Sequence, residues 1–194
     1  MRQLLRGVVV MAVAAWGGAA WATPVLDQNN TAGMGGRLCA SSICEMQQQV
    51  TAGITGRLTD VTLYGSGTID LRIALGNAFS TGPFVYNQIV TVNSSPIDVS
   101  AANITVTAGS RFVIDFLNVA NDDMPLSTVT YPGGDFYLKN LFDSELENLT
   151  TLFGWSLPFQ TFVDAPEPAS LALLATGLVG LATLGRRRQA RAPA

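Results

Sequence analysis

Chemistry in this 194-residue chain must come from side chains other than histidine, because the sequence contains none. That absence excludes Ser-His-Asp and Cys-His hydrolases, histidine-ligated zinc sites and imidazole general bases. Asp143, Glu145 and Glu147 could supply the two carboxylates that glycosidases hold about 5 Å or about 6.5–9.5 Å apart. Their run is instead typical of an exposed helix start, and nothing marks them as buried or paired. We therefore predict that the chain is not an enzyme; a secreted carboxylate-dependent glycan hydrolase is the alternative.

An oxygen-rich loop and a set of aromatic rings are the candidates for binding. Asn118, Asn121, Asp122 and Asp123 follow a hydrophobic stretch, and calcium accepts such oxygens as ligands. Their spacing matches no calcium motif, so a solvated turn is favoured and calcium at Asp122 and Asp123 is the alternative; no other cofactor is predicted. Flat rings can stack on sugars, and the candidates, each of which could equally be core or rim packing, are Tyr64, Tyr86, Tyr131, Tyr137 and Trp155.

Apolar and polar residues alternate from Gln47 onward, which is typical of β-strands. The candidate residues are therefore expected to be positioned by strands and by the turns between them. In residues 68–75 one face is aliphatic, whereas Asp70 and Arg72 lie on the other face as a predicted surface contact. Residues 143–152 could add one or two helical turns. The pattern predicts an all-β fold, an antiparallel β-sandwich of jelly-roll type over residues 47–165. The predicted strands, separated by glycine- and proline-rich turns, are residues 48–52, 57–64, 68–75, 84–92, 97–99, 104–107, 111–119, 135–140 and 155–163.

Residues 1–22 have the order of a secretory signal peptide. Arg2 and Arg6 precede an apolar run of about ten residues, which small residues follow. Ala20 and Ala22 occupy the positions that a signal peptidase must accommodate, so cleavage is predicted before Thr23. An uncleaved anchor is the alternative, although a spanning helix needs about 20 apolar residues.

Export would place Cys39 and Cys44 in an oxidising compartment. A disulfide that closes their six-residue loop is predicted there. A redox-active pair is disfavoured, because the spacing is not Cys-x-x-Cys. Residues 23–46 are therefore interpreted as an N-terminal segment that this disulfide staples.

The C-terminal end has three parts: Pro166-Glu167-Pro168, an uncharged apolar stretch over residues 169–185, and a basic tail over residues 186–194 that starts with Arg186, Arg187 and Arg188. Seventeen helical residues reach about 26 Å, which spans a core of about 30 Å if the flanking side chains snorkel. Basic flanks stay on the cytoplasmic side, so everything before the prolines is predicted to lie outside. One C-terminal transmembrane helix is therefore predicted.

This tail resembles the PEP-CTERM sorting signal of exported bacterial proteins, on the residues PEPASLALLATGLVGLATLGRRR. The resemblance implies that an exosortase, a membrane protease-transpeptidase, is the partner that cleaves near the motif and releases or transfers the protein. It also implies a bacterium that makes extracellular polysaccharide. Pro166 and Pro168 keep the segment extended, the form that a protease can grip. An ordinary tail anchor that is never cut is the alternative.

Residues 47–140 resemble the carbohydrate-binding type of jelly roll in exported bacterial proteins, on phrases such as Val106-Thr107-Ala108-Gly109 and Tyr131-Pro132-Gly133-Gly134. That family has no shared catalytic motif. Residues 23–165 hold five basic and thirteen acidic side chains, a net charge of −8, which argues against nucleic-acid binding and favours a neutral or cation-bridged glycan. We therefore predict an exported protein, anchored in the inner membrane as an intermediate and then located at the cell surface or outside, which acts structurally or binds extracellular polysaccharide.

Overall fold

Two antiparallel sheets form the fold in the computed structural model, which describes residues 23–38, 44–77, 82–118, 124–141, 145–165 and Gly177. The five-stranded sheet has the order β1 (Val25–Asn30), β13 (Phe159–Asp164), β4 (Gly56–Leu63) and β7 (Pro96–Asp98), with β8 (Thr105–Val106) also paired to β4. The six-stranded sheet has the order β12 (Leu146–Asn148), β11 (Phe136–Asn140), β3 (Cys44–Thr51), β9 (Arg111–Asn118), β5 (Gly67–Leu75) and β6 (Tyr86–Val92). A two-stranded ribbon joins β2 (Met34–Leu38) to β10 (Met124–Ser127).

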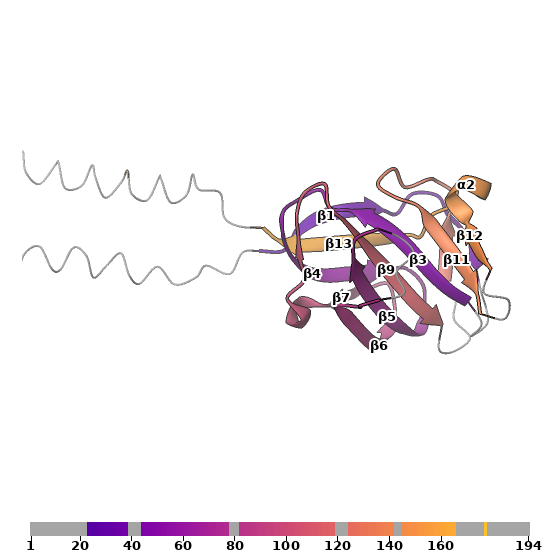
Figure 1. Cartoon of the computed structure of the whole chain (residues 1–194), viewed down its shortest axis with the longest axis horizontal. Coiled ribbons are helices and arrows are strands. Elements are labelled where there is room, and N and C mark those ends of the chain that lie inside the picture. The colour runs from indigo at the N-terminus through magenta and orange to yellow at the C-terminus, as the bar shows by residue number, and fades with distance from the viewer. Residues whose placement is uncertain are drawn as a thin grey trace, which may run out of the picture.

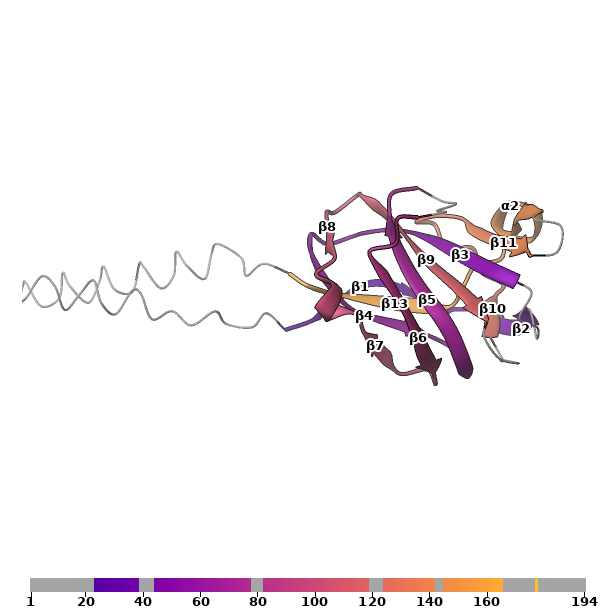
Figure 2. The same ribbon diagram turned by 60° about the horizontal axis from the view of Figure 1, so that its bottom comes forward.

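The two sheets enclose one hydrophobic core (Figure 2). β4 buries Leu58, Val61 and Leu63 from the five-stranded sheet, with a register shift against β13 between the first two, and alternation along β9 buries Phe112 and Phe116 from the six-stranded sheet. Sheets that pack face to face over a shared core form a sandwich-like domain. The all-β, antiparallel prediction is therefore confirmed.

Periodicity located nine of the thirteen strands in the described residues and missed four. All nine predicted strands have a counterpart, although β3 begins at Cys44 and β13 begins at Phe159. The prediction that Trp155 begins the last strand is therefore wrong, because Trp155 precedes β13. The strands that were not predicted are β1, β2, β10 and β12.

The N-terminal segment takes part in the sheets. β1 pairs with β13 along most of its length, and the side chain of Asp27 accepts hydrogen bonds from the backbone N–H groups of Gly53 (2.8 Å) and Ile54 (2.7 Å). β2 pairs with β10. Strand pairing thus extends the β-domain back to Val25, well before residue 47.

The short α-helix α2 (Leu149–Phe153) begins later than the acidic run predicted, and a 3-10 helix covers Ser100–Ala102. Asn148 is its N-cap, because the Asn148 side chain accepts a hydrogen bond from the Thr151 N–H at 3.0 Å. Glu147 lies in β12 and Glu145 directly precedes that strand, so the predicted acidic first turn is wrong. A side-chain cap outweighs the weaker attraction of acids to a helix start.

Several predicted features lie outside the described residues: the signal peptide with Ala20 and Ala22, Cys39, the loop with Asp122 and Asp123, Asp143, and the tail from Pro166 onward apart from Gly177. Within the described part of the chain no helix has the length and apolar character that a membrane crossing requires. The signal peptide and the C-terminal transmembrane helix therefore stay predictions.

Candidate functional site

The last strand ends directly at the predicted sorting signal. β13 lies between β1 and β4, and its residue Val163 is opposite Val25, so both described chain ends leave from the same end of the sandwich (Figure 1). Arg57 fixes Asp164 there through an ion pair of 2.8 Å. Gly56 packs so closely that an added Cβ would lie 2.7 Å from the Asp164 carbonyl oxygen. The fold is thus paired and packed up to two residues before Pro166.

A stacked aromatic pair lies at the other end of the sandwich, where Figure 1 shows α2. The rings of Phe153 and Trp155 have centroids 4.6 Å apart and planes inclined by 27°. Trp155 packs against the core, whereas Phe153 is 56% exposed. One face of Phe153 is therefore held by Trp155 while much of the ring is open to solvent.

Local sequence explains this stacking. Gly154 ends α2 in the left-handed conformation (φ 71°), which glycine adopts without steric cost, and its N–H bonds back to the Thr150 carbonyl. The reversal brings the rings on either side of Gly154 together. Two hydroxyls fix the turn, because Thr130 donates to the Gly154 carbonyl (3.0 Å) and Thr150 donates to the Trp155 carbonyl (2.8 Å).

Most of the tyrosines predicted as sugar platforms pack against the core or hydrogen-bond to other side chains of the domain. Tyr131 is 4% exposed, packs edge-on against Phe159 and donates its hydroxyl to Gln28 at 2.8 Å; burial raises its pKa to about 12. It is a core residue with no ring face free for a sugar. Tyr64 donates to Gln160 at 3.0 Å, and Tyr86 is partly buried against the core.

Tyr137 lies apart from the core, on the outer face of β11. Its hydroxyl donates to Asp135 at 3.3 Å, and Asn148 donates to the same carboxylate oxygen at 3.2 Å. Partial burial and the nearby Asp135 charge both raise the Tyr137 pKa. This ring is pinned at its tip and half-buried, so Phe153, which the sequence analysis did not select, is the more open platform. The aromatic-glycine-aromatic run at 153–155 was the signal that could have identified it.

A charged cluster occupies the outer face of the six-stranded sheet. Arg72, whose side chain is only 12% exposed, contacts Asp115 (Nε to Oδ2, 3.0 Å), Glu45 (3.3 Å) and Asp70 (3.8 Å). Lys139 also contacts Glu45, at 3.6 Å. The predicted Asp70–Arg72 contact is confirmed, but as one part of a cluster that is far less exposed than a surface pair.

Asp115 is the fully buried member of this cluster. Desolvation raises its pKa to about 8, and the negative charges of Glu45 and Asp70 act in the same direction. Arg72 and a hydrogen bond from Gln47 oppose this increase without cancelling it. The guanidinium of Arg72 also lies over the Phe84 ring, 4.8 Å from its centroid.

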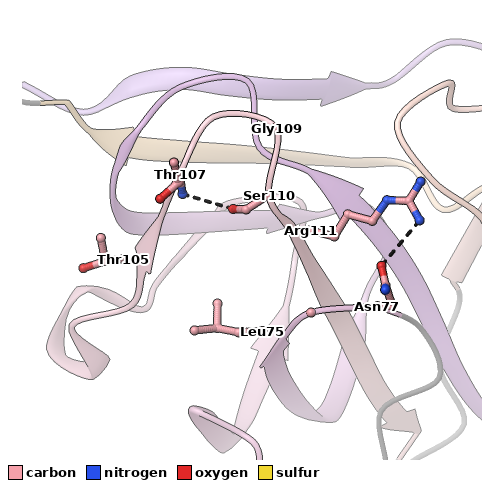
Figure 3. Close-up of a pocket in the computed structure, with 8 residues that line it drawn as sticks. Leu75, Asn77, Thr105, Thr107, Gly109, Ser110 and Arg111 are labelled. Atoms are coloured by element: carbon pink, nitrogen blue, oxygen red, sulfur yellow. Dashed lines mark hydrogen bonds between the residues drawn. The ribbon is translucent and has the colours of Figure 1, made fainter.

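A polar pocket of about 530 Å³ lies between the end of β5 and the β8–β9 turn, at the end of the sandwich where the chain ends leave (Figure 3). Arg111 is its charged residue, and Asn77 accepts a hydrogen bond from it at 3.5 Å. The pocket contains no carboxylate among its lining residues, so it offers no acid pair for glycoside hydrolysis. The residues that line it are Leu75, Gly76, Asn77, Thr105, Thr107, Gly109, Ser110 and Arg111.

The remaining candidate sites gain little from the structure. Glu145 and Glu147 are both exposed to solvent. The part of the chain that the structure describes holds no group of three or more His, Cys, Asp or Glu residues that could bind a metal. It also holds no free cysteine: Cys44 is buried at the start of β3, but Cys39 is outside the described residues, so the disulfide stays a prediction.

Comparison with known protein families matches residues 164–189 to the PEP-CTERM protein-sorting motif. The chain carries a PEP-CTERM motif. The matched range includes both Pro166-Glu167-Pro168 and the arginine cluster, so the resemblance seen in the sequence is confirmed. A PEP-CTERM motif implies an exported protein with a membrane-anchored intermediate, whose tail an exosortase processes. No curated protein and no solved structure matches the chain, and the jelly-roll assignment stays a prediction.

Proposed function

We propose that this chain is a non-enzymatic surface or matrix protein, processed by an exosortase, whose β-domain binds a neutral extracellular polysaccharide through Phe153. The observation that supports the proposal most is the position of α2, whose exposed Phe153 stacks on Trp155. Helix α2 lies at the end of the domain opposite the one where β13 ends, and the PEP-CTERM motif begins at the end of β13 (Figure 1). While the tail is in the membrane, this platform is held away from the anchor and toward the polysaccharide.

The chemistry of the platform selects the class of ligand. An aromatic ring supported from behind can stack on the apolar C–H face of a pyranose, and its partner holds it in one orientation. The acidic excess of residues 23–165 repels anionic polymers. A neutral glycan meets no such repulsion, so it is the ligand that both features favour.

Binding is tested with the exported protein on immobilised neutral and anionic polysaccharides, with and without calcium. Phe153→Ala should weaken binding to a neutral glycan by about threefold to tenfold, because aromatic stacking contributes about 0.5–1.5 kcal/mol. Leu152→Ala is the matched control: Leu152 is on the same helix and 59% exposed but offers no ring, so binding should be unchanged. Equal losses in the two variants, or no neutral glycan bound by the wild type, would contradict the glycan proposal.

Processing is tested separately by mass spectrometry of the C-terminus in fractionated cells of an exosortase-containing bacterium. The surface fraction should lack Arg186–Arg188, and deletion of the exosortase should restore them in the membrane fraction. An intact basic tail at the surface would instead indicate a permanently tail-anchored protein. The hydrolase alternative predicts polysaccharide turnover that Glu145→Gln or Glu147→Gln abolishes; we expect no turnover in the wild type.

A further inference from the structure

The outer edges of the two main sheets differ in how they are protected. Proteins blunt such edges with charge, proline, bulges or short strands, because an exposed edge can pair with another chain. β1 carries Asp27 and a register shift, and β7 is three residues long with Pro96 and Asp98. β12 is also three residues long and carries Glu147. Each of these edges has at least one of the usual protections.

The fourth edge, β6, has none of them. Its seven residues, Tyr86–Val92, contain no charge and no proline, and they pair with β5 in an unbroken register. The middle of the strand is open to solvent, since Asn87, Gln88 and Ile89 are all exposed. Ile89 is 69% exposed, more than any other large hydrophobic side chain of the described residues. Among the described residues β6 has β5 as its one strand partner, so its outer backbone edge is unpaired there, and an exposed apolar side chain lies at its centre.

We propose that β6 pairs antiparallel with β6 of a second copy of this chain, which joins two six-stranded sheets into one. The strand is self-complementary about its central residue: Ile89 would face Ile89 of the second copy, and Asn87 would face Thr91. On the other face Gln88 would lie opposite Val90. The Ile89 pair and the two Asn87–Thr91 pairs are the apolar and polar combinations that stabilise a ladder, Gln88 opposite Val90 is a mixed pair, and no like charges oppose each other.

Charge favours a second copy as the occupant at this particular edge. The exported portion is acidic, so two copies repel each other over most of their surfaces. β6 carries no charged residue along its seven positions, so it adds nothing to that repulsion. The edge strands β1, β7 and β12 each carry a carboxylate, at Asp27, Asp98 and Glu147, respectively.

The size of the contact sets the expected strength. Seven strand residues extend about 23 Å, and one added strand pair buries less than the roughly 1,200 Å² of a standard stable interface. The pairing is therefore weak in dilute solution and is favoured where many copies are confined, as on a membrane or in a surface layer. The inference does not depend on the proposed glycan site. That site lies on α2, which directly follows β12, and β12 and β6 are the opposite edge strands of the six-stranded sheet.

Register-specific cross-linking of the full chain in exporting cells tests this pairing. Cβ atoms of directly opposite residues lie about 5 Å apart, close to the distance that a disulfide bridges. Ile89→Cys should therefore give a dimer under mild oxidation, about tenfold more than Asn87→Cys or Thr91→Cys expressed alone. Co-expression of the last two variants should restore the dimer, because these positions face each other across the proposed axis.

A charge at the centre of the strand provides the complementary test. Ile89→Lys places two ammonium groups opposite each other, and the weight-average mass of the concentrated exported protein should fall to that of the monomer. Val129→Lys is the matched control, since Val129 is 46% exposed and lies outside β6, and it should associate like the wild type. Unchanged melting temperatures would show that both variants fold.

Three results would overturn the inference. The wild type could stay monomeric at the highest concentration and on cells. The cysteine variants at positions 87, 89 and 91 could give cross-links of equal yield, or the Ile89→Lys and Val129→Lys variants could lower the weight-average mass equally. Equal yields would indicate unspecific aggregation. Pairing of β6 with a different protein would appear as a cross-linked band whose mass is not twice that of the chain, and it would also refute a second copy as the occupant.

Discussion

Asp115→Asn should make the protein more stable than the wild type at mildly alkaline pH, although it removes a partner of Arg72. Asp115 is fully buried, and its pKa is raised to about 8. The unfolded chain loses the same proton near the ordinary carboxyl pKa of about 4. Between these pKa values the folded state holds a proton on Asp115 that the unfolded state lacks. The contribution of neutral Asp115 to the free energy of unfolding is therefore fully present below about pH 4, and it is lost as the pH rises through about 8.

The magnitude follows from this one-proton difference. Each pH unit between the two pKa values lowers the free energy of unfolding by about 1 kcal/mol, so the wild type should lose about 2 kcal/mol between pH 5.5 and pH 7.5 relative to Asp115→Asn. Asparagine has nearly the same shape as the neutral acid but cannot ionise. Arg72 keeps Glu45 and Asp70 as partners after the change.

Urea unfolding of both proteins at pH 5.5, 6.5 and 7.5 measures the difference. Asp98→Asn is the control, because hydrogen bonds with Ser100 lower the Asp98 pKa. The ionised Asp98 carboxylate therefore stabilises the fold at pH values above the usual carboxyl pKa, and this contribution is lost only when the pH falls into the acid range. Between pH 5.5 and pH 7.5 the free energy of unfolding of Asp98→Asn should change with pH in the same way as that of the wild type. If Asp115→Asn instead becomes relatively less stable as the pH rises, the ion pair with Arg72 outweighs desolvation and the reasoning is refuted.

Three further changes have definite expected outcomes. Gly56→Ala places a Cβ 2.7 Å from the Asp164 carbonyl oxygen and should cost about 1–3 kcal/mol in urea unfolding, whereas Gly35→Ala, whose nearest atom is 3.8 Å away, should change stability by less than about 1 kcal/mol. Asn30→Ala removes buried hydrogen bonds to Ser156 Oγ (2.9 Å) and to a backbone carbonyl, so the melting temperature should fall; an unchanged value would contradict a structural role. Cys44 should resist alkylation unless the exported chain is first reduced, and labelling without reductant would exclude the predicted disulfide.

Alternation predicted the strands that pack directly onto the core. Ile69, Leu71, Ile73 and Leu75 were predicted to share one face of a strand. The first three are fully buried, because a period of two maps onto the two faces of a strand, but Leu75, at the end of β5, is 52% exposed. The same period placed Arg72 on the opposite, polar face as a surface contact. The Arg72 side chain is instead only 12% exposed and contacts the fully buried Asp115, since a sequence period separates two faces but does not show what covers the polar one.

A strand with little alternation, such as β1, cannot be predicted from its sequence pattern alone. β1 has the sequence VLDQNN, in which only the first two residues are apolar, and its place is fixed by pairing with β13 some 130 residues away. The candidate site shows the same limit. Trp155 was selected for its residue type, but its stacking on Phe153 depends on the left-handed conformation of Gly154, which residue type alone does not reveal.

The topology links completion of the fold to the arrival of the sorting signal. Among the described residues β1 has one strand partner, β13, and β13 is the last strand before the PEP-CTERM motif. The first strand can therefore join the five-stranded sheet only after nearly the whole chain has crossed the membrane. A cut at or beyond Pro166 then leaves every described strand in the mature protein, because β13 ends at Asp164. An exosortase that acts at this motif thus acts on a chain that already contains everything its sheets require.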